Sequence, residues 1–409
     1  MKRQPTPHPT REEGEVARAT CHLCGAQTLD LAPAYDRLFR VTSDCRPFGS
    51  GGAIGCCCHC GLIQKRVDAQ WEAEARTIYD TYRIYAQSGG GDHALFDAQG
   101  GVVRRADLLV ARLLEAFPVP ATGRLLDVGC GNGNLLARFA QLRPDWRLCG
   151  TEWNDTHRQN VQAIPGVEGF YAGDLDQVAG GFDLITLVHI LEHTPDPRMF
   201  LRRVRDRLNP GGMLFIHLPD VAQNPFDLLN ADHCSHFTQT SLGDLLAAVG
   251  LEVVVRGAAW VAKEMSFLTR VSAPGQGIAP TTDTASANIA QQQRLLRAHM
   301  AWLQATGQLF RQAHGEPLGL FGTSIAATWL FQERAGAVDF FVDEDQHQVG
   351  RRHLDRPILA PAQVVDTATV LMPFSPARAR EIVQRLAKPG LHCLMPPALE
   401  NHVGVSEEA

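Results

Sequence analysis

The residues with the clearest chemical potential are cysteines, seven of which lie between positions 21 and 60 among the eleven in the chain. Cys21 and Cys24 belong to the sequence CHLCG, and Cys57 and Cys60 belong to CCHCG. Each CxxCG turn presents two thiolates to one ion while its glycine relaxes the backbone, so two such turns can close a tetrahedral zinc site. Four thiolate ligands leave no open position for water, which predicts a structural ion.

Other side chains in this segment can also bind zinc. An adjacent cysteine or a histidine can replace one of the four thiolates, and a set of buried free cysteines is the alternative to a metal site. Disulfides are not expected, because we expect the chain to stay in a reducing compartment. The additional candidate ligands are His22, Cys45, Cys56, Cys58 and His59.

A second motif is the glycine-rich sequence GCGNG, which follows the apolar run LLDV at residues 125–128. Glycine backbones at the start of a helix let a cofactor approach closely, although such a loop alone also fits a dinucleotide. Further along, RLCGTE ends in Glu152, which suits ribose hydroxyls, and AGD ends in Asp174, which suits an adenine amino group. The expected cofactor-binding residues are Asp127, Gly129, Gly131, Gly133, Glu152, Asp174 and His189.

The elements around these motifs indicate an α/β protein. Between Arg124 and about Val255, short apolar runs rich in β-branched residues alternate with helical stretches, which predicts a doubly wound parallel sheet. Residues 272–293 are poor in large apolar side chains and are interpreted as a linker. A long amphipathic helix follows, then the strands LGLFG, VDFFVD and TVLMPF with a helix from Ser324, which predicts a smaller α/β domain.

Five segments follow from this organisation. We expect a disordered tail over residues 1–20, a zinc-binding module over 21–85, the main catalytic domain over 86–271, the linker over 272–293 and a Rossmann-like domain over 294–409. A chain of 409 residues with 45% hydrophobic content is long enough for several separate cores.

The composition limits the function as well. A net charge of −6 provides no basic field for nucleic acid or for anionic lipid, so we expect a small-molecule acceptor. The first twenty residues are charged and rich in proline, and no uncharged stretch is long enough to cross a bilayer. These features favour a cytoplasmic protein with neither a nucleic-acid nor a membrane partner.

The stretch from residue 124 to 255 resembles the class I S-adenosylmethionine-dependent methyltransferases. After the glycine loop, FDLITLVHILEHTPDP and LNPGGMLFIHLPD are similar to the fourth and fifth strands of that family, in that order and at that spacing. The resemblance implies S-adenosylmethionine as cofactor and favours it over a dinucleotide. A binding or scaffold protein built on the same fold is the non-enzymatic alternative, and intact cofactor residues disfavour it.

Taken whole, the chain resembles the sugar C-methyltransferase family. CHLCG and CHCGLIQ are similar to its zinc knuckles, YDTYRIYAQSGG to its tyrosine-rich segment, and GLFGTSIAATWLFQ and FFVDEDQHQVGRRHLDRPILAP to two stretches of its C-terminal domain. The C-terminal domain matches more loosely than the rest. The resemblance implies deoxysugar biosynthesis, namely C-methylation of a nucleotide-linked 4-keto deoxysugar, with the C-terminal domain helping to hold the nucleotide.

The same resemblance places the catalytic residues in NADHCSHF at residues 230–237. His233 falls on the family's general base, and an imidazole with an ordinary pKa of about 6.5 can take the proton beside a ketone near neutrality. Asp232 either supports this imidazole or is a solvated loop carboxylate, and His236 is interpreted as structural.

One departure from the family concerns the acceptor. Asn230 stands where the family carries tyrosine, and an amide donates a weaker hydrogen bond to a ketone oxygen than a phenol does. O- or N-methylation of another small molecule, such as a natural product, is therefore the alternative function.

Three tyrosines spaced three residues apart either line the acceptor or form one packed helix face: Tyr79, Tyr82 and Tyr85. We take Tyr79 and Tyr82 as candidate substrate residues.

Overall fold

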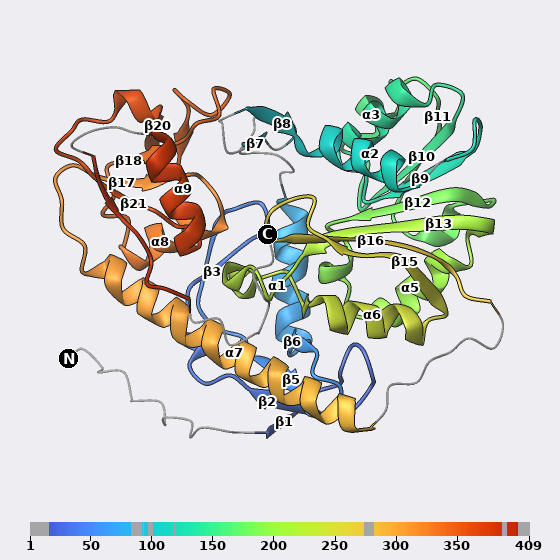
Figure 1. Ribbon diagram of the computed structural model, residues 1–409, viewed down its shortest axis with the longest axis horizontal. Coiled ribbons are helices and arrows are strands. Elements are labelled where there is room, and N and C mark those ends of the chain that lie inside the picture. The colour runs from blue at the N-terminus through green and yellow to red at the C-terminus, as the bar shows by residue number, and fades with distance from the viewer. Residues whose placement is uncertain are drawn as a thin grey trace.

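The protein has three lobes joined by one long helix (Figure 1). The computed structural model describes residues 16–82, 92, 94–96, 101–117, 119–273, 282–386 and 391–399. The N-terminal module covers 16–82, the central domain covers 101–273, and the C-terminal domain covers 312–399. Tyr85 and most of the expected tail lie outside the described residues.

The central domain contains a seven-stranded sheet in the order β11-β10-β9-β12-β13-β16-β15. All of its strands run parallel except β16, which is antiparallel to both neighbours. The doubly wound sheet was predicted, but β16 was not, so the sheet is mixed rather than wholly parallel. The strands are β9 (Arg124–Val128), β10 (Arg147–Glu152), β11 (Val167–Ala172), β12 (Phe182–Val188), β13 (Leu208–Pro219), β15 (Leu251–Ala258) and β16 (Glu264–Val271).

Helices cover both faces of this sheet, as buried apolar side chains require. Leu109 and Phe139 pack in one core with the first face, and Leu201 and Leu245 pack in a second core with the other. The first face carries α2 (Arg105–Ala116), α3 (Asn134–Leu142) and α4 (Arg158–Gln162), and the second carries α5 (Pro197–Arg205) and α6 (Gln239–Ala248). Short 3-10 turns complete the loops: η2 (Leu175–Gln177), η3 (Leu191–His193) and η4 (Pro225–Leu229).

The N-terminal module is a five-stranded sheet whose last strand comes from the central domain. Its order is β1-β2-β5-β6-β14, and β14 pairs antiparallel with β6. The strands of this sheet are β1 (Val16–Arg18), β2 (Thr28–Leu31), β5 (Ile54–Cys57), β6 (Ile63–Lys65) and β14 (Ser235–His236). The module also contains the strand pair β3 (Arg40–Val41) and β4 (Pro47–Phe48), the turn η1 (Tyr35–Arg37) and the helix α1 (Ala69–Asp80). The expected tail is therefore wrong at 16–18, because β1 pairs with β2.

The C-terminal domain is a second doubly wound sheet in the order β19-β20-β18-β17-β21-β22, in which only β19 runs antiparallel. Its strands are β17 (Leu318–Phe321), β18 (Phe340–Val342), β19 (Arg352–His353), β20 (Arg356–Leu359), β21 (Thr369–Leu371) and β22 (His392–Leu394). Its helices are α8 (Ile325–Glu333), α9 (Pro376–Leu386) and the turn η5 (Pro361–Gln363). A small hairpin, β7 (Ala94–Phe96) and β8 (Val102–Arg104), precedes the central domain.

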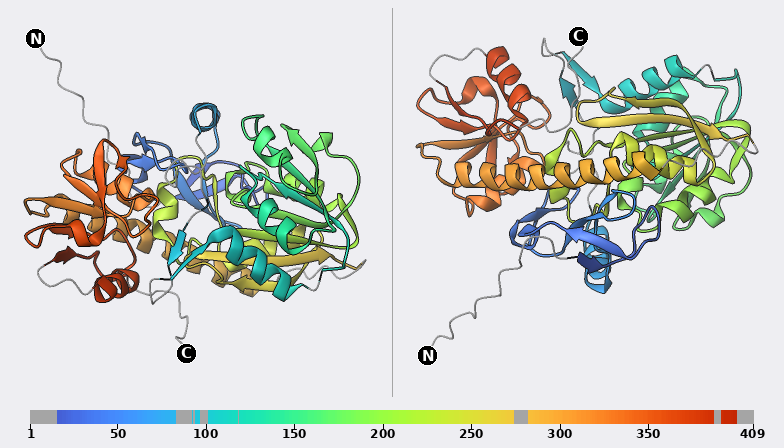
Figure 2. Two further views of the ribbon diagram at one scale, coloured as in Figure 1. Left: turned by 90° about the horizontal axis from the view of Figure 1, so that it is seen from above. Right: turned by 60° about the horizontal axis from the view of Figure 1, so that its bottom comes forward.

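Helix α7 (Thr282–Arg311) runs beneath the central and C-terminal lobes, as the right-hand view of Figure 2 shows. The predicted linker is therefore wrong over 282–293, which is helical. Gly61 allows this helix to pack closely against the N-terminal module, because a Cβ built on Gly61 would lie 3.3 Å from Cα of Ile289. Within the described ranges, no helix has the length and apolar character needed to cross a membrane.

Candidate active site

The glycine loop lies between β9 and α3 and leaves no room for larger residues. Gly129, Gly131 and Gly133 all have positive φ angles, of 71°, 56° and 89°. A Cβ on Gly129 would lie 2.0 Å from Ile190, and one on Gly133 would lie 2.5 Å from Ile164. Only glycine adopts this backbone and fits this space without strain, so the loop forms a bare cradle of the kind that a bound cofactor needs.

Acidic side chains follow the strands beside this cradle. Glu152, at the end of β10, accepts hydrogen bonds from the backbone N–H groups of Gly131 and Trp153, each at 2.8 Å. Asp127 is buried and accepts a hydrogen bond of 2.6 Å from the Thr186 hydroxyl, and burial raises its pKa to about 7. Asp174, after β11, is exposed and forms an ion pair with Arg203. All three predicted acids therefore reach one edge of the sheet.

His189 begins a cluster that the sequence did not reveal. It follows β12 with a φ angle of 55°, and its Nδ1 lies 3.1 Å from Oε1 of buried Glu192. Glu264, on β16, accepts a hydrogen bond from Arg105 and lies 2.5 Å from Nε2 of His217. Burial opposes charge on His189, but Glu264 and Glu192 outweigh it and raise its pKa to about 9. The two carboxylates thus favour the protonated form of this partly buried imidazole at the cofactor edge.

Asp227 organises the segment 225–236, here called the histidine loop. Its Oδ1 lies 2.8 Å from Nδ1 of His233, and its Oδ2 lies 2.6 Å from Nδ1 of His236. An ionised carboxylate only accepts hydrogen bonds, so each Nδ1 carries the proton and each Nε2 retains a lone pair. The sequence analysis missed Asp227, although an acid six residues before the expected base was a usable signal.

The charges of this group are strongly coupled. Burial raises the pKa of Asp227, but His233 and His236 overcome that effect and hold it well below the ordinary value. Burial likewise disfavours the charged form of His233, yet the Asp227 carboxylate outweighs it and raises the pKa of His233. Burial dominates for His236, whose pKa is lowered. His233 is therefore the more basic of the two imidazoles.

Asp232 does not hold the His233 imidazole. It is fully buried, accepts a hydrogen bond of 2.9 Å from the backbone N–H of Ser43, and contacts the Ser43 hydroxyl at 2.5 Å. Its Oδ2 also lies 3.4 Å from Nδ1 of His193. The interpretation of Asp232 as a solvated carboxylate is wrong, and its electrostatic effect on the pKa of His233 is smaller than that of Asp227.

A second imidazole and a tyrosine lie beside the expected base. The rings of His193 and His233 meet edge to face with centroids 4.5 Å apart. The Tyr79 hydroxyl lies 3.0 Å from Nδ1 of His193, and the Tyr79 ring contacts exposed Trp153. Tyr82, just beyond the end of α1, touches Tyr79 by its ring edge and is 38% exposed. Their role as substrate residues stays a prediction.

Asn230 is buried within the same group. Its Nδ2 lies 3.3 Å from Oδ1 of Asp227 and 3.2 Å from Nδ1 of His233. Its Oδ1 is buried without a hydrogen-bond partner among the described residues. The amide nitrogen is thus directed at the carboxylate that positions His233.

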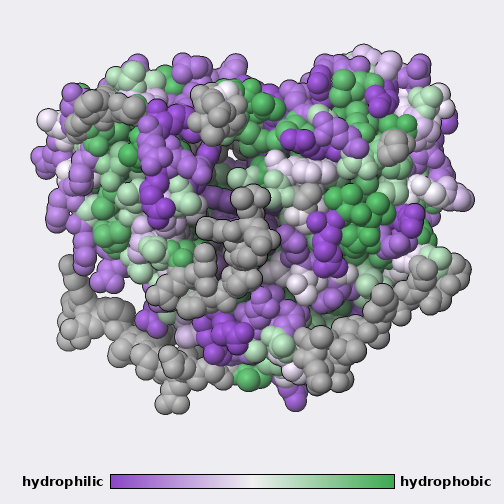
Figure 3. Space-filling model, in the orientation of Figure 1, coloured by the Kyte–Doolittle hydropathy of each residue, from purple (hydrophilic) through white to green (hydrophobic). Residues whose placement is uncertain are grey.

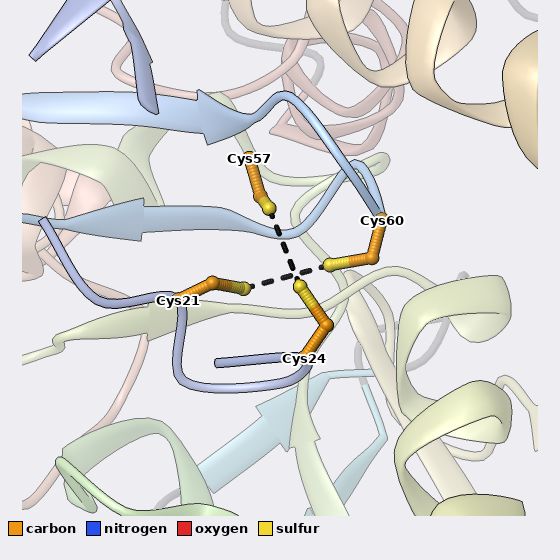
Figure 4. Close-up of side chains that lie close together, drawn as sticks. All are labelled: Cys21, Cys24, Cys57 and Cys60. Atoms are coloured by element: carbon orange, nitrogen blue, oxygen red, sulfur yellow. Dashed lines mark hydrogen bonds between the residues drawn. The ribbon is translucent and has the colours of Figure 1, made fainter. Parts of the chain in front are cut away.

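The four expected zinc ligands converge from two loops (Figure 4). Sγ of Cys21 lies 3.5 Å from Sγ of Cys60, and Sγ of Cys24 lies 3.6 Å from Sγ of Cys57. Thiolates bound tetrahedrally at about 2.3 Å from zinc are separated by about 3.8 Å, so these spacings fit one ion. Two of the other candidates are directed elsewhere: Cys56 Sγ lies 3.4 Å from the carbonyl oxygen of Gly61, and His22 Nδ1 lies 2.8 Å from Ser235 Oγ. The cluster of four comprises Cys21, Cys24, Cys57 and Cys60.

The cysteine cluster and the histidine loop are physically joined. His22 sits inside the first knuckle and contacts Ser235, which belongs to β14. The backbone N–H of Lys65 on β6 donates to the carbonyl of Cys234, and the Trp71 indole on α1 donates to the carbonyl of Ala231. The N-terminal module therefore holds the backbone on which His233 is carried.

Comparison with known proteins agrees with this geometry. A family model described as a methyltransferase domain matches residues 100–255. The chain is 31% identical over 129 residues to a trans-aconitate 2-methyltransferase of Deinococcus radiodurans, covering 31% of this chain and 46% of the relative. It is 30% identical over 150 residues to a ubiquinone biosynthesis O-methyltransferase of Xanthomonas axonopodis pv. citri, covering 34% of this chain and 52% of the relative.

The chain thus spans about half the length of these curated relatives. Among solved structures, a S-adenosylmethionine-dependent methyltransferase from Clostridium acetobutylicum is 12% identical with a TM-score of 0.35, covering 49% of this chain and 99% of that one. The family match over residues 100–255, together with a sheet whose one antiparallel strand is β16 (Glu264–Val271), supports a class I S-adenosylmethionine-dependent methyltransferase domain in this part of the chain.

Proposed function

We propose that this protein transfers a methyl group from S-adenosylmethionine to the carbon beside the ketone of a nucleotide-linked 4-keto deoxysugar. The observation that carries the proposal is the buried pair formed by Asp227 and His233, with 2.8 Å between Oδ1 and Nδ1. Such a pair fixes the tautomer of the imidazole and leaves Nε2 able to accept a proton. Carbon methylation needs this base, because the carbon beside a ketone becomes nucleophilic only when its proton leaves.

The glycine cradle and the acidic strand ends would hold the cofactor. Glu152 would accept hydrogen bonds from the ribose hydroxyls. Asp174 would accept one from the adenine amino group while keeping its ion pair with Arg203. Asp127, buried below the loop, supports the cradle through Thr186. When bound, S-adenosylmethionine supplies an electrophilic methyl group on a sulfonium.

The protein's own residues would then manage the acceptor's proton and charge. His233 accepts the proton at Nε2, and Asp227 offsets the imidazolium that results. The Tyr79 hydroxyl, 3.0 Å from Nδ1 of His193 and so beside the base, is the donor available to the enolate oxygen. Burial lowers the pKa of His193, with a further contribution from His233, which favours its neutral form.

The acceptor's nucleotide would lie between the N-terminal module and the C-terminal domain. A cavity of about 390 Å³ opens there, beside the carboxyl ends of the C-terminal strands. Arginines are prominent in its lining, and guanidinium groups recognise phosphate well. The lining includes Arg46, Thr323, Arg351, Arg352 and His353.

The proposal also includes one structural zinc ion on Cys21, Cys24, Cys57 and Cys60. The sulfur spacings suit tetrahedral ligation, and the backbone N–H of His59 points at Sγ of Cys57 at 3.4 Å, as a knuckle that stabilises a thiolate would. Through the pairing of β6 with β14, this ion would stabilise the loop that carries His233.

O- or N-methylation of another small molecule is the second candidate. Asn230 favours it, because its amide nitrogen is directed at Asp227 and His233. The amide therefore does not take over the hydrogen bond that the family's tyrosine could donate to the ketone oxygen. The comparisons support only the methyltransferase domain, since the family model matches residues 100–255 and the two curated relatives align with only 31% and 34% of this chain.

Incubation with methyl-¹³C-labelled donor and a panel of nucleotide-linked keto sugars tests the choice. We expect NMR to show the label bonded to a ring carbon beside the former ketone position. Label found on oxygen or nitrogen, or methylation only of acceptors that lack a ketone, would overturn C-methylation and favour the second candidate. The matched control is the same panel of nucleotide sugars with each ketone reduced to the corresponding alcohol, which should not accept the label on carbon.

A further inference from the structure

Three side chains at the carboxyl edge of the central sheet have no role in the proposed reaction. His189 follows β12, His217 lies on β13 and Glu264 begins β16, and these three strands are neighbours in the sheet. The backbone N–H of His189 donates to the carbonyl of His217 at 2.8 Å, and His217 pairs with Ser266 across β13 and β16. The sheet itself therefore brings the three side chains together, although they are far apart in the sequence.

The ligand atoms of these side chains lie close to one another. Nε2 of His217 lies 2.5 Å from Oε2 of Glu264, and Nε2 of His189 lies 3.5 Å from Oε1 of the same carboxylate. One ligand atom from each of the three residues lies within 4.8 Å of the other two. Nitrogen and oxygen atoms bound tetrahedrally at about 2.0–2.1 Å from a zinc ion are about 3.3 Å apart. The observed spacings bracket that value, so one ion fits among them.

Both imidazoles are held through the opposite ring nitrogen. Nδ1 of His189 lies 3.1 Å from Oε1 of Glu192, and Nδ1 of His217 lies 2.9 Å from Oγ of Ser266. A metal-binding histidine usually donates its other N–H to an outer partner, which fixes the tautomer and orients the ring. Nε2 of His189 is buried and has no hydrogen-bond partner among the described residues. Each ring thus presents Nε2 to the space beside Glu264.

The carboxylate has an outer partner as well. Arg105, at the start of α2, donates to Oε1 of Glu264 at 2.9 Å. This bond leaves Oε2, the oxygen beside His217, for an ion. Carboxylates that bind a metal are themselves hydrogen-bonded in this way. All three candidate ligands therefore carry the kind of support that metal ligands need.

The charges of the group favour a cation between the two histidines. Glu192 and Glu264 are only 1% and 12% exposed, and Arg105 contributes one fixed positive charge against these two carboxylates. Buried carboxylates need compensating charge. A proton on His189 or a divalent ion provides it, and the ion would replace the proton on Nε2. A proton alone would not require both imidazoles to be held through Nδ1, so the arrangement favours the ion.

An ion can reach this position from solvent. The side chain of His189 is 26% exposed, whereas that of His217 is fully buried. Lys263, the residue before Glu264, has its Nζ 5.7 Å from the ring centroid of Phe374, so this edge of the sheet faces the C-terminal domain. Figure 3 shows the surface hollowed between these two lobes. Solvent therefore reaches the site from the side of His189.

We propose that His189, His217 and Glu264 form a second metal site, which takes one divalent transition-metal ion such as zinc. Two imidazoles and one carboxylate suit such an ion, and three protein ligands leave a position open for water or for an oxygen atom of the acceptor. The cluster of four cysteines has no such position. The inference does not depend on which atom of the acceptor is methylated.

Titration with cobalt(II) tests the site, because the spectrum of this ion distinguishes thiolate ligands from imidazole and carboxylate ligands. Purification with a mild chelator should leave one zinc per chain, on the four cysteines. Added cobalt should then bind in a ratio of one per chain and give weak visible ligand-field bands without a thiolate-to-cobalt charge-transfer band. Failure to bind cobalt, or binding only with the charge-transfer band, would overturn the proposal.

Substitutions separate ligation from folding. Glu264→Gln and His217→Gln should abolish the cobalt bands, because each removes a ligand. Ser266→Ala keeps all three ligands and should weaken cobalt binding about 10- to 100-fold, the usual effect of losing an outer partner, so it tests the site even if a ligand variant does not fold. The matched control His299→Gln removes a buried imidazole on α7 and should leave the bands unchanged. Equal cobalt affinity in the wild type and Glu264→Gln would contradict the assignment.

Nitrogen NMR identifies the ligands directly. Zinc added to protein labelled with ¹⁵N at histidine should shift Nε2 of His189 and His217 and leave the ring of His299 unchanged. Shifts at His193 and His233 instead would place the ion beside the proposed base and overturn this site. Metal binding requires neither donor nor acceptor, so its failure would leave the proposed methyl transfer intact. Conversely, label found on oxygen or nitrogen would overturn C-methylation and leave the metal site standing.

Discussion

The central sheet and the C-terminal sheet share a doubly wound topology, but their carboxyl edges differ in charge. The central edge carries three glycines with positive φ and the acidic groups Glu152 and Asp174. The switch point of the C-terminal sheet carries one such glycine, Gly322, beside Phe374, whose ring centroid lies 5.7 Å from Nζ of Lys263. One topology thus carries carboxylates at one carboxyl edge and lies beside a lysine amine at the other.

The histidine loop lies between these edges and contacts both. His233 meets His193, which follows the central strand β12, while Phe226 meets the amine of Lys263. Nearly all side chains of the loop are buried, unlike exposed Asp174 on the cofactor edge. The comparison therefore separates cofactor binding, acceptor binding and proton transfer into regions that single substitutions can test independently.

The largest expected effect comes from removing the metal. Structural zinc sites contribute about 10–16 kcal/mol of apparent binding free energy, which is largely folding free energy. Purified protein should contain one zinc per chain by elemental analysis, and Cys24→Ser or Cys60→Ser should unfold the module. Hydrogen exchange should then increase at β6 and β14 but not at the glycine loop. Metal-free protein that stays folded and fully active would refute the site, and Cys393→Ser is the control.

The next largest effect concerns His233. His233→Asn should reduce turnover about 10²- to 10⁴-fold, the usual contribution of a positioned acid or base, while the Kd for S-adenosylmethionine stays unchanged. With a keto-sugar acceptor in deuterium oxide and S-adenosylhomocysteine present, the wild type should exchange the proton beside the ketone and the variant should not. Exchange at the wild-type rate in the variant would transfer the role to His236 or His193.

Asp227 should set the pH at which this base works. The base is active when neutral, so kcat should rise as pH passes upward through the folded pKa of His233, which Asp227 raises above the ordinary value. Asp227→Asn removes the largest contribution that opposes burial and leaves only Glu192 and Asp232 to raise the pKa of His233, so this rise in kcat should move to lower pH, with a lower plateau. Asp232→Asn should move the rise in kcat by less. If both variants move the rise by the same amount, Asp227 has no special part in positioning the His233 imidazole.

Much of this architecture could be predicted from the sequence, because it depends on local patterns. Apolar runs predicted the strands β9, β12 and β13. The two CxxCG turns predicted the four cysteines that converge in the structure. What the sequence did not reveal depends on contacts between distant residues. Asp227 and Glu192 resemble ordinary loop acids until the fold buries them, and β14 joins the cysteine module only because the chain returns to β6 after residues 66–234. The start of α7 was missed because its small residues resemble a linker.

Glu152 tests the cofactor edge by itself. Glu152→Ala should weaken S-adenosylmethionine binding about 10- to 150-fold by calorimetry, since a charged acceptor of the ribose hydroxyls is lost. The KM for the acceptor should not change. Glu168→Ala removes a carboxylate from the neighbouring strand β11 and is the matched control. Unchanged affinity in Glu152→Ala would mean that this carboxylate only ties Trp153 to the glycine loop.

The smallest expected effect concerns Asp174, whose carboxylate is exposed and shared with Arg203. A typical hydrogen bond contributes about 0.5–1.5 kcal/mol, so Asp174→Ala should weaken S-adenosylmethionine binding only about 2- to 13-fold. Asp176 provides a close control, because it also pairs with Arg203 at 2.9 Å but is not expected to contact adenine. Asp176→Ala should leave the affinity unchanged. The donor's adenine can be replaced by a purine without the 6-amino group, and this analogue should bind wild type and Asp174→Ala equally. If Asp174→Ala and Asp176→Ala weaken binding by the same factor, the effect belongs to Arg203 and the ion pair, and Asp174 has no contact of its own with the cofactor.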